Sequence, residues 1–383
     1  MTAAQAMAWE QRVMRAAHPV AFPALGLLRR PVQRVPRLGV VVRDADLLRG
    51  VLMDAERFTK TGPGSPADLW TPVLGPKVLL NMEGDEHLLL RRRLGPLFSP
   101  ATVGALVDDH LGTALADLTT RLRDGEPVDL LVEAKRNASR VITSLVGLAP
   151  GAVDEALFDR VSSVTRSVRL QRPRLSDRDA AAARGILAEL AVHARAAYAG
   201  DESTVPGRMR ALGLSEDEAM GAVGAFVLTG TETIVAFLPR MVALLIDSGW
   251  MARLRREPER IDAAIAEGLR VTTPSPVMLR SVAAPAEIGG LAVRPGERVI
   301  LATFLANAAA GDFDPEANPA ASLKQLWFGA GVHFCLGAPL AMAQVRSSLD
   351  ALLAVDGLHI VSRRAASGVL IPSYASLRVA AAA

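Results

Sequence analysis

The single cysteine of the chain, Cys335, lies in a glycine-rich stretch between residues 328 and 341. Gly329, Gly331 and Gly337 allow the backbone of this stretch to turn sharply and to approach a flat ligand closely. A helix predicted to begin immediately after the loop presents free N–H groups and positive dipole potential to the cysteine. Together these features stabilise a thiolate, the form of cysteine that binds metal. Because no second cysteine is present, a metal here takes its other ligands from elsewhere, and a porphyrin supplies them.

A second group that can do chemistry lies in a long apolar helix, predicted to begin at Ser215 and to reach about residue 245. Residues 229–233 read Thr-Gly-Thr-Glu-Thr and place an acid, Glu232, beside a hydroxyl, Thr233. An acid and a hydroxyl side by side can pass protons to a reacting oxygen. Alone the pattern is weak, because Thr and Glu within helices are usually solvated or bonded to helix carbonyls.

The glycine-rich loop resembles the haem-binding loop of the cytochrome P450 monooxygenases, Phe-x-x-Gly-x-His/Arg-x-Cys-x-Gly. The matching positions are Phe328, Gly331, His333, Cys335 and Gly337. The resemblance implies that Cys335 is the thiolate ligand of a haem b, iron protoporphyrin IX. It also implies that the loop, with Phe328 and Gly329, packs against the haem. A thiolate ligand donates electron density to the iron and favours cleavage of the O–O bond.

Residues 229–233 resemble the oxygen-activation motif of the same family, in which a small residue and Gly precede any residue, an acid and Thr. The resemblance implies that Glu232 and Thr233 deliver protons to bound dioxygen. It implies that Gly230 leaves room for dioxygen beside the haem. Thr229 stands where the family usually has Ala or Gly, and we expect it to crowd the distal pocket or to add a hydroxyl there.

Further motifs of the family follow in the expected order. Glu267 and Arg270 match Glu-x-x-Arg, which implies a buried structural pair. The resemblance also implies a set of cations that bind the haem propionates: His87, Arg91, Arg280 and His333. His87 and Arg91 stand at i and i+4 of one predicted helix, so both side chains face the same way. Arg92 is an alternative to Arg91.

Several positions depart from the family. Its usual Arg in the segment before the cysteine loop completes a triad with Glu-x-x-Arg, but no Arg occurs here between Val299 and Val345. Ala308 and Ala309 replace the usual Arg-Asp, and Met342 replaces a frequent Arg. These losses predict a less rigid core and weaker retention of haem.

The elements that must position these groups are mostly helical. Apolar periodicity predicts helices over 86–97, 100–123, much of 154–199, 259–271 and 339–355, with short strands at 40–42, within 277–299 and in the tail. We therefore expect a mainly α fold with a small β-sheet region (α+β), with the haem between the long helix and the helix after the cysteine loop. Residues 1–383 read as a single haem domain without a fused reductase, and roughly 1–80, 277–300 and the C-terminal tail contribute its β-rich part.

Composition narrows the alternatives. One cysteine excludes an internal disulfide framework, a zinc site with two or more Cys, and a Cys-ligated iron–sulfur cluster. A net charge of +3 with 4% aromatic residues argues against nucleic-acid binding. The N-terminus shows no leader pattern, and its most apolar stretch is too short to span a membrane, so we expect a soluble, cytoplasmic protein. We also expect a monomer.

We therefore predict a monooxygenase that hydroxylates or epoxidises an apolar, small-to-medium organic substrate. The resemblance implies electrons from a ferredoxin and its ferredoxin reductase, docking near Cys335 with help from Arg91–Arg93, Lys324 or Arg346. Pocket residues are expected from 70–80, the irregular part of 154–184, 225–229, 277–278 and 373–375. Alternatives are a peroxygenase, an enzyme of ring coupling or rearrangement, and a haem-binding non-catalytic protein. A cysteine hydrolase using Cys335 and His333 lacks an orienting third group.

Overall fold

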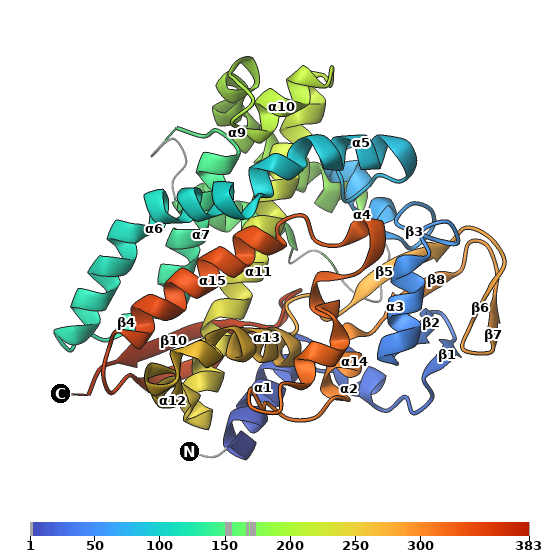
Figure 1. Ribbon diagram of the computed structural model, residues 1–383. Helices are drawn as coiled ribbons and strands as arrows, with labels where there is room; N and C mark the ends of the chain where they lie inside the picture. Colours follow the sequence, from blue (N-terminus) through green and yellow to red (C-terminus); the bar gives the residue numbers. More distant parts are fainter. Residues whose placement is uncertain (1–2, 150–154, 166–167, 169–173, 383) are drawn as a thin grey trace.

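A long helix, α11 (Glu216–Ser248), runs through the centre of the protein (Figure 1). The computed structural model describes residues 3–149, 155–165, 168 and 174–382. The helix begins where predicted, and Ser215 and Glu218 form a capping box at its start with both reciprocal hydrogen bonds present. The helix continues through Pro239, where the sequence predicts a bend. It is long and apolar enough to cross a membrane, but 61% of its most apolar window is buried. Such burial is typical of the core helix of a globular domain.

Two helix pairs form the framework around α11. Helix α7 (Leu130–Leu145) packs along α11, and α15 (Ala338–Leu353) packs along α6 (Pro100–Arg123). The remaining α-helices are α1 (Ala3–Ala17), α2 (Ala21–Gly26), α3 (Ala45–Met53), α4 (Pro66–Leu74), α5 (Gly84–Leu94), α8 (Glu155–Val164), α9 (Asp177–Ala199), α10 (Val205–Ala211), α12 (Trp250–Arg256), α13 (Ile261–Thr272) and α14 (Thr303–Ala308). Short 3₁₀ turns include η1 (Gly95–Phe98), η3 (Pro258–Arg260), η4 (Pro319–Leu323), η5 (Leu326–Phe328) and η6 (Gly331–His333).

The strands gather at one side of the molecule and beneath the helices (Figure 1). The larger sheet has the order β1 (Val32–Val35), β2 (Gly39–Val42), β8 (Arg298–Leu301), β5 (Met278–Val282) and β3 (Phe58–Thr59). Its β2–β8 pair is parallel and the other pairs are antiparallel. A second sheet contains β4 (Val128–Asp129), β10 (Tyr374–Ala380) and β9 (His359–Ala365), and β6 (Ala286–Ile288) forms a hairpin with β7 (Leu291–Val293).

The predicted mainly helical architecture with small sheets is confirmed. The strand expected at 40–42 is β2, and Asp44 caps α3 by accepting from the N–H groups of Asp46 and Leu47. The first eighty residues carry three strands of the larger sheet and also four helices. What matters for the site is that α5, α11, α15 and the loop before α15 meet around one space.

Candidate active site

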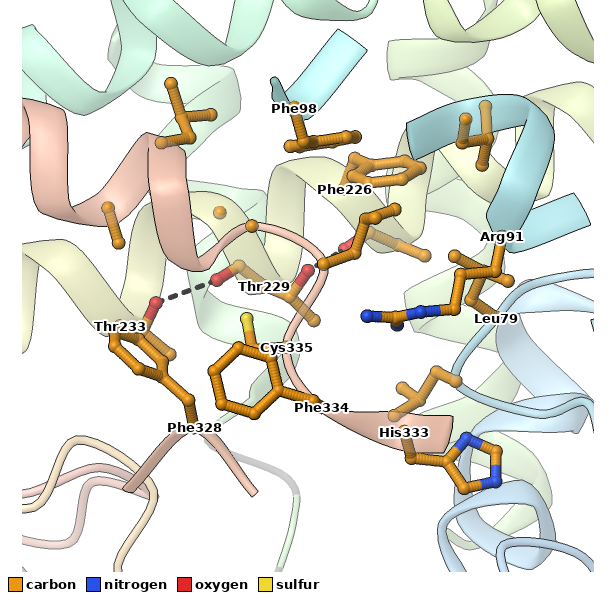
Figure 2. A pocket seen from close by; sticks show the side chains of 18 of the residues that line it. Leu79, Arg91, Phe98, Phe226, Thr229, Thr233, Phe328, His333, Phe334 and Cys335 are labelled. Atoms are coloured by element: carbon orange, nitrogen blue, oxygen red, sulfur yellow. Dashed lines mark hydrogen bonds between the residues drawn. The ribbon is translucent and has the colours of Figure 1, made fainter. Parts of the chain in front are cut away.

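A cavity of about 340 Å³ lies between α11, α5 and the loop that carries Cys335 (Figure 2). Its walls come from α5, α7, α11, the cysteine loop and the first turns of α15. Most of the lining is apolar, and apart from Ser275 and Gln344 the polar side chains belong to two groups. One is the Thr229–Thr233 face of α11, and the other is a group of basic side chains near His333.

The cysteine loop is held by its own backbone and by glycine. The Cys335 N–H donates to the Phe328 carbonyl at 2.9 Å, which closes the loop. Gly331 has φ +65°, and a Cβ there would lie 2.8 Å from the Leu52 carbonyl oxygen, so only glycine fits. The Phe328 and Phe334 rings meet edge to face at 6.0 Å. Sequence-predicted Gly329 has φ +83° but no crowding, and it is not part of the cavity lining.

The Cys335 side chain is accessible through the cavity that it lines, and Figure 2 shows its sulfur facing that space. Burial by the surrounding protein nevertheless raises the pKa of the thiol. Backbone N–H groups of Gly337 and Ala338 and the charges of Lys60 and Arg91 act in the opposite direction. A bound metal ion overrides such a penalty because it deprotonates a coordinating thiol outright. No hydrogen bond between described residues joins His333 to Cys335, so the nucleophile–base pair of a hydrolase is not formed.

The α11 motif presents one of its two predicted proton-transfer groups to the cavity. The Thr233 hydroxyl lines it and donates to the Thr229 carbonyl at 2.9 Å (Figure 2). The Thr229 hydroxyl donates to the Ala225 carbonyl at 2.8 Å, so it is satisfied within the helix. Thr229 thus adds bulk to the cavity wall, as expected, while its hydroxyl hydrogen is committed to the helix.

Glu232 is next to Thr233 in sequence but does not line the cavity. Its carboxylate accepts from the Thr165 hydroxyl at 3.5 Å, just beyond α8. Gly230 does line the cavity, and a Cβ there would lie 2.7 Å from Ile142 Cδ1 of α7. The glycine therefore lets α7 approach α11 closely, a reason that the sequence alone does not reveal.

The predicted cations meet at one end of the cavity. The His87 and His333 rings lie 4.3 Å apart, and both side chains and Arg91 line the cavity. Arg280 lies behind this wall, 4% exposed. Burial lowers the pKa of Arg280 to about 10 and that of His87 to about 4, and it lowers the pKa of Arg91. The Nδ1 atoms of His87 and His333 are buried and have no partner among the described residues.

Two residues of this cluster were not found from the sequence. Glu83 accepts a hydrogen bond from His333 Nε2 at 2.6 Å and another from the Lys60 N–H. Lys60 lines the cavity near Arg91, His87 and His333. Neither residue belongs to a motif of the family. The usable signals are an acid just before the helix with His87 and a lone lysine in a Gly/Pro-rich turn.

Glu267 and Arg270 are fully buried and paired at 2.5 and 2.9 Å. Arg270 also donates to the carbonyls of Asn307, Gly311 and Asp312. Glu267 accepts the backbone N–H groups of Asp314 and Ala320 at 3.0 and 3.1 Å. Backbone groups thus complete the hydrogen bonding of the Glu267–Arg270 pair, in a segment that lacks the family's usual arginine.

The predicted pocket segments contribute unequally. Within them, the structure places on the lining Val78, Leu79, Leu80, Ala225, Phe226, Thr229 and Met278. Residues 373–375 do not line the cavity. Residues 154, 166–167 and 169–173 of the predicted segment 154–184 lie outside the described residues.

The residues present fit a haem. The cavity wall has phenylalanine rings, a cysteine sulfur that faces inward, and buried cations beside unpartnered imidazole nitrogens. These groups match an iron porphyrin that carries carboxylates. Cations buried without matching anions are costly, and carboxylates of a bound group remove that cost.

The chain resembles known proteins over most of its length. The family model described as Cytochrome P450 matches residues 252–354. The Erythromycin C-12 hydroxylase of Saccharopolyspora erythraea is 30% identical over 368 residues, covering 88% of each chain. The C-19 steroid 1alpha-hydroxylase of Sorangium cellulosum is 30% identical over 303 residues, 74% of this chain and 75% of the relative.

Solved structures show the same fold. P450BioI, in a crystal structure with an acyl carrier protein that bears hexadec-9Z-enoic acid, superposes with a TM-score of 0.81 at 20% identity. That alignment covers 97% of this chain and 99% of P450BioI. CalO2 superposes with a TM-score of 0.76 at 27% identity, covering 95% of this chain and 96% of CalO2.

Proposed function

The chain belongs to the cytochrome P450 family and is a haem monooxygenase, and we propose that residues 1–383 form one haem domain that oxidises an apolar, small-to-medium organic substrate. The observation that carries the proposal is the inward-facing sulfur of Cys335, at the centre of a largely apolar cavity with buried cations at one end. Cys335 is the proposed iron ligand, and haem b is the proposed cofactor. When bound, a thiolate-ligated haem supplies the reduction of dioxygen and the insertion of one oxygen atom into a substrate.

The chain's own groups have distinct proposed roles at the haem. His87, Arg91, Arg280 and His333 hold the propionates, while Phe328, Gly329 and Gly337 shape the loop around the sulfur. The imidazole rings act as neutral hydrogen-bonding groups, because burial holds the pKa of His87 at about 4 and lowers that of His333. The arginines supply the charge.

Proton delivery is assigned to α11. With its hydrogen committed to the Thr229 carbonyl, the Thr233 oxygen keeps two lone pairs, so in this arrangement it accepts hydrogen bonds at the cavity wall. It therefore holds a water or a protonated group there and donates a proton only after its hydroxyl rotates. Glu232 is the proposed proton source on the far face of the helix, reached from the Thr165 side. Its proton enters the cavity by rotation of its side chain or through water.

The substrate class follows from the cavity wall. The residues above Cys335 are mainly apolar, and they include the stacked Phe98 and Phe226 rings, 5.7 Å apart. Such a surface favours apolar molecules through desolvation. The steroid in the name of one relative suits this class, whereas the erythromycin in the name of another is a larger molecule. Hydroxylation or epoxidation is the proposed outcome.

Electrons are proposed to come from a ferredoxin and its ferredoxin reductase, docking beside the cysteine loop. Arg92 and Lys324 are exposed, and the structure gives them no salt bridge with the acids it describes. Arg93 pairs with Glu202 at 3.5 Å, and Arg346 pairs with Asp262 and Asp350. We therefore narrow the docking cations to Arg92 and Lys324, with Arg346→Ala as the matched control. Equal reduction rates for Arg92→Ala/Lys324→Ala and wild type would refute this docking surface.

The central experiment is haem binding. Purified protein should contain one haem, and its reduced form with carbon monoxide should give the absorption band of a thiolate-ligated haem. Cys335→Ala should lose that band, whereas Thr233→Ala should keep it. A protein that takes up no haem, from expression or by reconstitution, contradicts the proposal. We also propose that the protein is a cytoplasmic monomer and that it binds no nucleic acid. Size-exclusion chromatography tests the monomeric state.

A further inference from the structure

Lys60 lies in the turn between β3 and α4, and its main chain is fixed on both sides. Its N–H donates to Glu83, and its carbonyl accepts the Ala67 N–H at 3.0 Å. The preceding residue, Thr59, pairs with Ser281 of β5, directly after Arg280. The pairing of β3 with β5 therefore brings Lys60, which lines the cavity, close to the buried Arg280, which does not.

Glu83 occupies the N-cap position of α5 but makes no cap hydrogen bond with its side chain. Its carboxylate instead bridges the Lys60 N–H and His333 Nε2. Burial raises the pKa of this carboxyl, but the bonds from His333 and Lys60 outweigh that effect and hold the pKa below its usual range. Glu83 is thus a carboxylate that joins three segments: the Lys60 turn, α5 and the cysteine loop.

The Lys60 side chain lines the cavity together with His87, Arg91 and His333. The structure gives its ammonium no salt bridge with any described acid, although Glu83 is near enough to act on it by charge. Burial lowers the pKa of Lys60 to about 7, and the Arg280 charge adds to this effect. A lysine placed in this way becomes fully charged only when an anion joins it.

The charges at this end of the cavity indicate what that anion is. Arg91 and Arg280 are cationic, Glu83 is anionic, and burial keeps the two imidazoles neutral. Lys60, with its pKa lowered to about 7, adds a third positive charge once an anion lies beside it. Two further negative charges balance the cluster, and a haem brings two carboxylates. We infer that Lys60 is a further haem-carboxylate ligand of this protein, positioned by Glu83 rather than serving only as its counter-ion. This inference rests on the proposed function, because it requires a haem in the cavity.

The test measures haem retention and not turnover. Ferric holoprotein is mixed with excess apomyoglobin, and the rate of haem transfer is followed for wild type, Lys60→Met and Lys60→Arg. We expect transfer from Lys60→Met to be about tenfold faster, the effect of one lost charge-assisted hydrogen bond, and transfer from Lys60→Arg to stay within about threefold of wild type. The Fe(III)/Fe(II) midpoint potential of Lys60→Met should fall, because a removed cation no longer favours the reduced form.

Lys77→Met is the matched control, since Lys77 is a surface lysine that pairs with Glu86 outside this cavity. It should release haem at the wild-type rate. Reconstitution with haem dimethyl ester, which lacks the carboxylate charges, should abolish the difference between wild type and Lys60→Met. If Lys60→Met does not accumulate as folded protein, the same comparison is made with Lys60→Gln.

Three results would overturn the inference. The first is a transfer rate and potential of Lys60→Met equal to those of wild type. The second is an undiminished difference between the two proteins with the dimethyl ester. The third is recovery of the wild-type transfer rate in Lys60→Met/Glu83→Gln, which would make Lys60 a counter-ion for Glu83 alone. A wild-type protein that binds neither haem nor its ester fails a different test, that of the proposed function.

Discussion

Replacing Glu267 by Gln tests whether the buried pair with Arg270 is complete without the family's usual arginine. Each Glu267 oxygen accepts two hydrogen bonds, one from Arg270 and one from a backbone N–H of Asp314 or Ala320. Glutamine keeps the shape of the side chain but turns one oxygen into an NH₂ group. That group cannot accept, so it faces two donors, and the Arg270 charge is left without its anion.

The expected cost is large because both side chains are fully buried. Removing one partner of a buried ion pair costs about 3–5 kcal/mol, since the remaining charge stays desolvated. Arg270 keeps its three backbone carbonyl acceptors, which places the expected loss in the lower half of that range. At ~2.1 cal/mol/K of unfolding entropy per residue over 383 residues, a loss of about 3–4 kcal/mol lowers the Tm by about 4–5 °C.

Differential scanning calorimetry and urea unfolding followed by circular dichroism measure this loss in the haem-loaded protein. Glu257→Gln is the matched control. Glu257 also binds arginines, Arg253 at 3.0 Å and Arg260 at 2.5 Å, but these three side chains are 27–35% exposed. Pairs that water and salt screen contribute little to stability, so the control should lower the Tm clearly less than Glu267→Gln does. If Glu267→Gln shifts the Tm no more than this control does, the argument from buried charge is wrong.

Three further predictions follow from the site. Thr233→Ala should lower the amount of product formed per dioxygen consumed by roughly tenfold or more, with peroxide released instead, because a hydrogen-bonding group is lost from the cavity wall. An unchanged ratio of product to dioxygen in oxygen-electrode assays would favour a peroxide-driven enzyme. Gly331→Ala should lower the Tm by at least about 1–2 °C and reduce haem content, because φ is +65° and the Leu52 carbonyl oxygen lies 2.8 Å from the new Cβ; full haem content would contradict this reading of the loop. Haem-free protein should lose stability as the pH falls from about 6.5 towards about 4, because burial lowers the pKa of His87 and the unfolded chain binds a proton there that the folded chain does not. In His87→Asn the urea midpoint of unfolding should change less with pH over that interval. An unchanged pH dependence in this variant would contradict the role of His87.

Local patterns were enough to predict much of the fold and part of the site. The glycine spacing around Cys335 is local in sequence, and so is the capping box at Ser215. The structure contains the capping box, and Gly329 and Gly331 have positive φ values, whereas Gly337 has φ −82°. The long apolar stretch that becomes α11 predicts a buried helix because it is apolar around most of its circumference.

Contacts between distant segments could not be predicted in the same way. Glu83 meets His333 across 250 residues, and Gly230 is required because Ile142 of another helix packs against it. Neither contact leaves a periodic signal, since each depends on how two elements cross. The orientation of Glu232 is of the same kind. Sequence places it beside Thr233, but adjacent residues of a helix point about 100° apart, so only one of them faces the cavity.

The missing arginine shows why a lost side chain need not mean a lost interaction. The sequence predicts a weaker core because residues 299–345 contain no Arg, yet segment 307–320 binds the buried pair with its backbone, three carbonyls to Arg270 and two N–H groups to Glu267. Backbone groups are present whatever the side chains are, so this coordination constrains the path of the segment rather than its composition. That path is demanding, because the non-glycine residues Asn318, Lys324 and Gln325 adopt positive φ values. Such conformations persist only where surrounding contacts fix them. The buried pair therefore stabilises the approach to the cysteine loop through backbone geometry, and substitutions that change φ there should harm haem binding more than substitutions that only remove charge.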